Sequence, residues 1–207
     1  MWMSSWLASL NHSLMGLNIQ NPTPRIGIIG IGHELRGDDG VGPFILRRLL
    51  SSLEAKDTYL LVDAGPVPEN YTRLLREFMP DLVILIDAAD MHQPPGTIQW
   101  LPWQDSIGLS ASTHSLPVHL FAEYLQLELK CEILLLGIQP SSLSMGTGLS
   151  PIVCRSAEKV ILGLTTLLLS PRYQATAYRR SVTKTHHSSI ANHMQQPRQE
   201  RISSWHY

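Results

Sequence analysis

The stretch IGIIGIGHELRGDDGVG, residues 26–42, joins a short apolar run to a glycine-rich loop that contains two adjacent aspartates. Residues 26–31 have the length and the continuous aliphatic character of a strand that is buried on both faces. Pro43 suits the first turn of a helix, so a helix is expected to follow the loop. A buried strand, a glycine loop and a helix in this order predict the start of an α/β sheet.

The same alternation continues along the chain. Apolar runs predict three more buried strands, and the Pro95-Gly96 turn opens a fifth strand, expected to be antiparallel at an edge. The predicted strands are 26–31, 59–62, 82–86, 97–101 and 133–138, and the predicted helices are 44–53, 69–78, 116–127 and 153–169. We therefore predict an α/β three-layer sandwich with a mostly parallel, twisted sheet of about five strands flanked by helices.

Composition separates a central domain, residues 25–170, from two extensions. Residues 1–24 contain scattered apolar residues and no Lys or Arg, so we expect a poorly ordered extension and no secretory signal. Residues 171–207 have few aliphatic side chains and many Ser, Gln, His and Arg, which predicts a disordered basic tail. No stretch approaches the roughly 20 apolar residues of a membrane span.

The overall charge and the cysteines argue against a nucleic-acid or membrane partner and against a disulfide-rich or cysteine-metal fold. The formal net charge of the 207 residues is −1, which gives no reason to expect nucleic acid or a membrane as a partner. Cys131 and Cys154 have neither the spacing of a disulfide framework nor that of a metal site. A cytoplasmic protein, in a compartment where thiols stay reduced, is the simplest interpretation. We also expect a monomer.

Acidic residues follow three of the predicted strands. Asp38 and Asp39 come directly before the first helix, Asp63 follows the second strand and Asp87 the third. Because the carboxyl ends of parallel strands meet at one edge, these acids are expected at the same rim. His114 lies where the third predicted helix begins, and the helix dipole there keeps an imidazole neutral. Two carboxylates and one neutral imidazole suit zinc, nickel or cobalt.

Two other interpretations stay open at this point. Each acid alone could be a helix or loop cap, and His114 could be a histidine that is hydrogen-bonded in a turn. The glycine loop also invites comparison with a dinucleotide fingerprint, but the third glycine position falls on Leu35. The two acids that follow would repel a pyrophosphate. A flavodoxin-like or Rossmann-like nucleotide-binding module remains the alternative.

The order of the motifs resembles that of the nickel-iron hydrogenase maturation proteases. The motifs are Gly30-Ile31-Gly32 followed by residues 35–42, Asp63-Ala64-Gly65, Pro68-Glu69-Asn70, Ile86-Asp87-Ala88, Thr113-His114 and Leu136-Gly137-Ile138-Gln139-Pro140. The last of these, with Pro68-Glu69-Asn70, indicates the branch of the hydrogenase 3 maturation proteases. The resemblance extends over about residues 25–168, which makes it more specific than any single motif.

This resemblance implies an endopeptidase that removes the C-terminal extension of a nickel-iron hydrogenase large-subunit precursor after nickel insertion. It also implies that Asp39, Asp87 and His114 are metal ligands that recognise nickel carried by the precursor, with no permanent cofactor. Asp38 is the candidate general base, and so the candidate catalytic residue. A checkpoint protein that binds the nickel site of the precursor without cutting it is a further alternative.

The chain departs from the family at His33, where an asparagine usually follows the Gly-x-Gly motif. An asparagine there would stabilise the loop through its side-chain hydrogen bonds. We expect His33 to replace part of this function or to add a metal ligand.

Overall fold

The apolar runs of the sequence form a five-stranded sheet in the computed structural model, which describes residues 5–18, 24–105 and 117–171. The strands are β1 (Ile26–Ile31), β2 (Tyr59–Gly65), β3 (Leu82–Ala88), β4 (Ile98–Leu101) and β5 (Glu132–Ile138). Their order across the sheet is β2-β1-β3-β5-β4. All neighbouring pairs are parallel except β4 and β5 at the edge. The mostly parallel sheet with an antiparallel edge strand is therefore confirmed.

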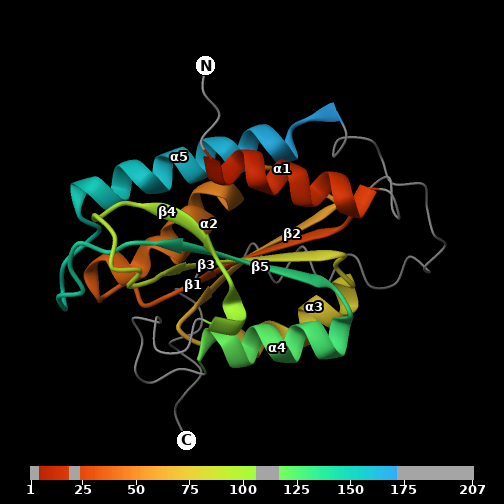
Figure 1. The fold of residues 1–207 in the computed structure, drawn as a ribbon, viewed down its shortest axis with the longest axis horizontal. Coiled ribbons are helices and arrows are strands. Elements are labelled where there is room, and N and C mark those ends of the chain that lie inside the picture. Colours follow the sequence, from red (N-terminus) through yellow and green to blue (C-terminus); the bar gives the residue numbers. More distant parts are fainter. Residues whose placement is uncertain (1–4, 19–23, 106–116, 172–207) are drawn as a thin grey trace, which may run out of the picture. The chain divides into compact units, whose positions relative to one another are not determined.

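Helices cover both faces of this sheet (Figure 1). The α-helices are α1 (Ser5–Asn18), α2 (Val41–Ser52), α3 (Thr72–Phe78), α4 (Val118–Leu129) and α5 (Pro151–Leu168). Short 3-10 helices are η1 (Gly37–Gly40), η2 (Pro68–Tyr71) and η3 (Trp103–Asp105). α1, α2 and α5 lie over one face, whereas α3 and α4 lie over the other (Figure 1). The predicted three-layer sandwich is confirmed.

Two of the three inner strands, β1 and β3, show why the sequence contains unbroken aliphatic runs. Every residue of β1 and β3 is buried. Side chains alternate along a strand, so Ile28 and Ile84 join the core under α1, α2 and α5, while Ile29 and Leu85 face the opposite layer. A strand that is covered on both sides needs apolar residues at every position.

The predicted poor order of residues 1–24 is wrong for the part that the structure describes, which forms α1. Trp6, Leu10 and Leu14 are spaced four residues apart, so they share one face of the helix. All three side chains are buried in the core. The indole Nε1 of Trp100 donates a 2.7 Å hydrogen bond to the Trp6 carbonyl oxygen, which fastens α1 over β4. The intervening Ser, Asn and His residues concealed this stripe in the sequence.

The predicted central domain, residues 25–170, ends close to the end of α5 at Leu168, but its start at residue 25 leaves out α1. All described helices and strands lie within one unit, Met1–Ala177. The predicted basic tail, residues 171–207, lies outside the described residues from 172 onward. Among the helices that the structure describes, none combines the length and the apolar character needed to cross a bilayer.

Replacing Leu10 by alanine is expected to destabilise the protein by about 2–5 kcal/mol, because the change removes buried methyl groups and leaves a cavity. Leu162→Ala on α5 is the matched control, since the Leu162 side chain is 69% exposed. The control is expected to change stability by no more than about 0.5 kcal/mol. Urea unfolding followed by tryptophan fluorescence measures both variants. An equally small loss of stability in Leu10→Ala and in Leu162→Ala would show that α1 does not pack into the core.

Candidate active site

The candidate site lies at the carboxyl ends of β1 and β3, where η1 and α2 approach the sheet closely. Gly32 has a φ of +130°, and a Cβ atom on it would lie 1.8 Å from the carbonyl oxygen of Asp39. A Cβ atom on Gly42 would lie 2.5 Å from the carbonyl oxygen of Ile86. Only glycine fits at these two positions, so η1 and the first turn of α2 rest directly on the strand ends.

Asp39 is buried in η1 with one carboxylate oxygen unpaired. Its Oδ2 accepts a 2.9 Å hydrogen bond from the backbone N–H of His33. Its Oδ1 is buried and has no hydrogen-bond partner among the described residues. Burial raises the pKa of Asp39, and the His33 N–H and the Arg36 guanidinium offset only part of that effect. An unpaired buried oxygen is costly unless a ligand satisfies it.

Asp87 is the second buried acid of this site and lies within the end of β3, which extends past the predicted residue 86. Burial raises the pKa of Asp87 well above its usual value, and the charge of Asp39 raises it further. The N–H of Ala88 offsets part of this effect. Two buried acids within electrostatic reach of each other favour a shared proton or a bound cation. Two of the three predicted metal ligands therefore lie within electrostatic reach of each other.

The third predicted ligand, His114, lies outside the described residues, which leave out 106–116. The helix expected to begin beside it, α4, begins at Val118. Within the described ranges, no three His, Cys, Asp or Glu side chains are placed to hold a metal ion together. Asp39 and Asp87 supply hard oxygen donors that suit a divalent cation. The three-ligand site stays a prediction.

Asp38, the predicted general base, is fully buried and hydrogen-bonded through both oxygens. Its Oδ1 accepts a 2.6 Å bond from the backbone N–H of Ser150. Its Oδ2 accepts bonds from the backbone N–H groups of Ser141 and Ser142 and from the Ser150 hydroxyl, at 2.8, 3.0 and 2.9 Å. These bonds fasten the loop between β5 and α5 to η1. Asp38 thus has a structural role, and its catalytic role stays a prediction.

Ser150 is a site residue that sequence reasoning missed. It is the N-cap of α5, where its hydroxyl oxygen accepts a hydrogen bond from the Val153 N–H. A serine followed by proline before an apolar helix indicates a helix start, so the N-cap role of Ser150 could be predicted from the sequence. The hydrogen bond from Ser150 to Asp38 could not be predicted, because it joins residues 112 positions apart.

Asp63, the remaining acid expected at this rim, lies beside an arginine. The Nε atom of Arg47 on α2 is 3.4 Å from Asp63 Oδ2, and the Nη1 atom of the same arginine is 3.0 Å from Glu34 Oε2. A guanidinium between two carboxylates balances part of the negative charge on this side of the rim. Sequence reasoning placed Asp63 at the rim but did not find its partner.

His33 stabilises the glycine loop through its side chain, as expected from its position. Its Nδ1 atom accepts a 3.2 Å hydrogen bond from the backbone N–H of Leu35. This bond spans two residues, as an asparagine side chain does in an Asx turn. The backbone N–H of His33 meanwhile binds Asp39. The expectation that His33 stabilises the loop is confirmed by this geometry.

Comparisons with known proteins agree with the motif resemblance. The family model described as hydrogenase maturation protease matches residues 44–166. A candidate hydrogenase maturation protease of Methanocaldococcus jannaschii is 36% identical over 123 residues, which cover 56% of this chain and 72% of that protein. The hydrogenase 3 maturation protease of Escherichia coli K12 is 30% identical over 114 residues, covering 55% of this chain and 71% of the relative.

Solved structures share the same fold. The [NiFe] hydrogenase maturation protease HycI of Thermococcus kodakarensis aligns with a TM-score of 0.65 at 29% identity, over 74% of this chain and 98% of that chain. The endopeptidase HycI of Escherichia coli aligns with a TM-score of 0.60 at 26% identity, over 67% and 87%. The chain belongs to the hydrogenase maturation protease family. Its activity is that of a peptidase, so the nucleotide-binding alternative is set aside.

Replacing Asp87 by asparagine is expected to stabilise the metal-free protein, increasingly so as the pH rises. The pKa of Asp87 is higher in the folded than in the unfolded protein, so the folded state binds more protons. Stability is then lost as the pH rises from the unfolded pKa toward the folded pKa. Asparagine has no charge to bury. The difference between the urea midpoints of the two proteins should be larger at about pH 8 than at about pH 5, and a difference that becomes smaller as the pH rises would contradict the buried charge.

Asp38→Asn is expected to destabilise the protein by roughly 1–3 kcal/mol, because an amide NH₂ would face N–H donors that now reach a carboxylate. Faster hydrogen exchange at the amides of Ser141 and Ser142 should accompany this loss. Ser144→Ala in the same exposed loop leaves all four bonds to Asp38 intact, so it is the control. Unchanged exchange in Asp38→Asn would show that the carboxylate does not hold the loop.

Proposed function

We propose that this protein removes the C-terminal extension of a nickel-iron hydrogenase large-subunit precursor after nickel has been inserted. Relatives named as hydrogenase maturation proteases support this class of substrate. The observation that carries nickel recognition is the buried pair of Asp39 and Asp87, in which one oxygen of Asp39 has no partner among the described residues. Asp87 and His114 lie within residues 44–166, the range that the family model matches, whereas Asp39 lies before it.

In this proposal the nickel arrives with the substrate. A nickel ion held by precursor thiolates accepts further oxygen and nitrogen ligands, which Asp39, Asp87 and His114 supply. The cation neutralises negative charge that burial has made costly, so the nickel-loaded precursor binds more tightly than the empty one. Metal content thereby decides which precursor molecules are cut.

Hydrolysis at this site adds one water molecule across a peptide bond. The water oxygen bonds to the carbonyl carbon, the C–N bond breaks, and a proton passes to the leaving nitrogen. A cation beside the bond polarises the carbonyl group or lowers the pKa of a bound water. The two buried carboxylates hold the cation, and with it the scissile bond, between η1 and the end of β3.

The cysteines fit a cytoplasmic location and take no part in the proposed chemistry. Cys131 and Cys154 are both free thiols, as in a reducing compartment. Burial raises the pKa of the Cys131 thiol to about 11. It stays protonated at neutral pH, and a protonated thiol is a poor nucleophile.

Incubation of the purified protein with nickel-loaded precursor should produce a mass loss equal to the C-terminal extension. Asp39→Asn, Asp87→Asn and His114→Ala are each expected to lower kcat/KM by at least about 100-fold, because a missing ligand loosens the cation beside the scissile bond. Mass spectrometry of the precursor measures cleavage. Nickel-free precursor should remain intact.

Glu158→Gln is the control, since this acid is exposed on α5 and its loss should leave cleavage unchanged. Equal cleavage by the wild type and by all three ligand variants would contradict the proposed nickel site. Binding of the nickel-loaded precursor without any mass loss would instead support the non-cleaving checkpoint protein.

A further inference from the structure

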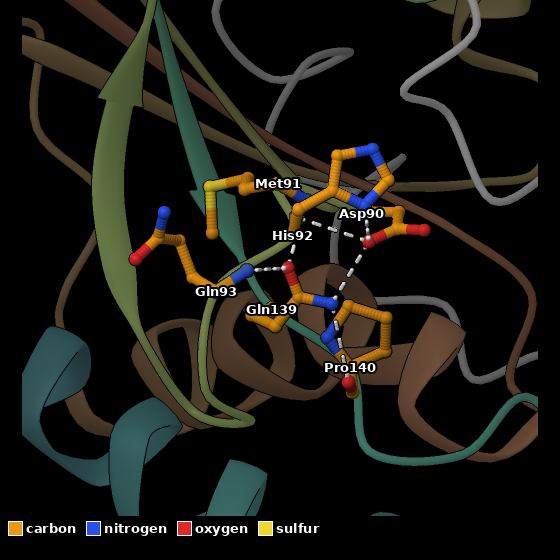
Figure 2. A network of polar contacts seen from close by, with 6 residues as sticks. All are labelled: Asp90, Met91, His92, Gln93, Gln139 and Pro140. Carbon is orange, nitrogen blue, oxygen red and sulfur yellow. Dashed lines mark hydrogen bonds and ion pairs between the residues drawn. The ribbon is translucent and has the colours of Figure 1, made fainter.

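The amide group of Gln139 ties the loop after β3 to the end of β5 (Figure 2). Its Oε1 accepts hydrogen bonds from the backbone N–H groups of Met91, at 2.7 Å, and Gln93, at 3.3 Å. Its Nε2 donates to Asp90 Oδ1 at 3.2 Å and to the Pro140 carbonyl oxygen at 3.5 Å. The side chain is buried, and the amide uses both of its donors and both lone pairs of its oxygen.

The segment held by Gln139, residues 90–93, lies beside the candidate site. Asp87 of β3 pairs in register with Gly137 of β5. The sulfur atom of Met91 lies 3.1 Å from the position of a Cβ atom on Gly137. Paired residues of parallel strands project toward the same face of a sheet, so Met91 folds over the face to which Asp87 belongs.

The backbone of this segment is held in an unfavourable conformation. His92 has a φ of +55°, which is uncommon for a residue other than glycine. Its N–H donates to Asp90 Oδ1, the same oxygen that accepts from Gln139. Together these bonds lower the pKa of Asp90, which keeps it charged. Strained residues persist where their surroundings fix them, and they cluster at ligand-binding segments.

We propose that Gln139 is a positioning residue that holds residues 90–93 as a wall of the peptide-binding rim beside Asp87, where this wall binds the precursor next to its scissile bond. The inference rests on the proposed function, since it names the surface that receives the same substrate. A loop already fixed in its binding conformation avoids the ordering cost that a loose loop incurs on binding. Loosening it weakens substrate binding and transition-state binding equally, which raises KM and leaves kcat unchanged.

Gln139→Glu tests this role with a side chain of the same shape. The glutamate keeps an acceptor for the N–H groups of Met91 and Gln93, but it places a second carboxylate against Asp90. We expect KM for nickel-loaded precursor to rise about tenfold with kcat unchanged. Hydrogen exchange at the amides of Met91 and Gln93 should accelerate, and the thermal midpoint should fall modestly, because the buried glutamate faces Asp90 and the Pro140 carbonyl oxygen without a donor.

A second substitution tests whether the Gln139–Asp90 bond carries the effect. Asp90→Asn combined with Gln139→Glu removes the repulsion and gives the glutamate an amide donor, so KM should fall back toward the wild-type value. The Asp90→Asn single variant completes the double-mutant cycle. Gln126→Glu makes the same amide-to-acid change on the exposed surface of α4, so it is the matched control and should leave KM, kcat and exchange unchanged.

Three outcomes would overturn the inference: an unchanged KM in Gln139→Glu, a loss confined to kcat and thermal stability, or no recovery in the double variant. Calorimetric affinity for the nickel-loaded precursor gives the same test without cleavage. If the wild type binds that precursor but does not cut it, the proposed function fails. Gln139→Glu must still bind about tenfold more weakly, or the positioning role fails as well.

Discussion

The contact between the start of α2 and the ends of β1 and β3 sets the geometry of the whole site. With no side chain at Gly42, the carbonyl oxygens of Ile31 and Ile86 approach within 2.5 Å of the position that a Cβ atom would occupy. This packing fixes the height of η1 above the sheet. η1 carries two consecutive acids with different tasks, because Asp38 fastens the loop before α5 while Asp39 lies in electrostatic reach of Asp87.

The different environments of these acids show where the fold is stable and where it is prepared for a ligand. Asp38 has four hydrogen-bond donors, so its charge is compensated within the protein. Asp39 and Asp87 are also buried, but burial opposes the ionisation of both, and the charge of Asp39 further opposes that of Asp87. A group that lowers stability is commonly retained where function needs it. In this protein the compensating charge is proposed to come from the substrate.

The sheet and part of the site could be predicted from the sequence alone. Unbroken aliphatic runs such as Ile26–Ile31 occur where a strand is covered on both faces, and acids at strand ends placed Asp39 and Asp87 on one rim. α1 was missed because polar residues separate its three buried side chains. The roles of Asp38 and Gln139 could not be foreseen, since their partners are 112 and 48 residues away and local pattern carries no information about such pairs.

The position of α1 also has a consequence for the order of folding. This first helix packs on β4 and reaches α5, the last helix, so its contacts close some of the longest loops in the domain, 94 residues in the case of Trp6 and Trp100. Long loops cost more entropy to close and form late. The sheet with α2 and α3 has mainly shorter-range contacts to form first. We therefore expect α1 to dock only after β4 and α5 have formed, and its docking completes the core.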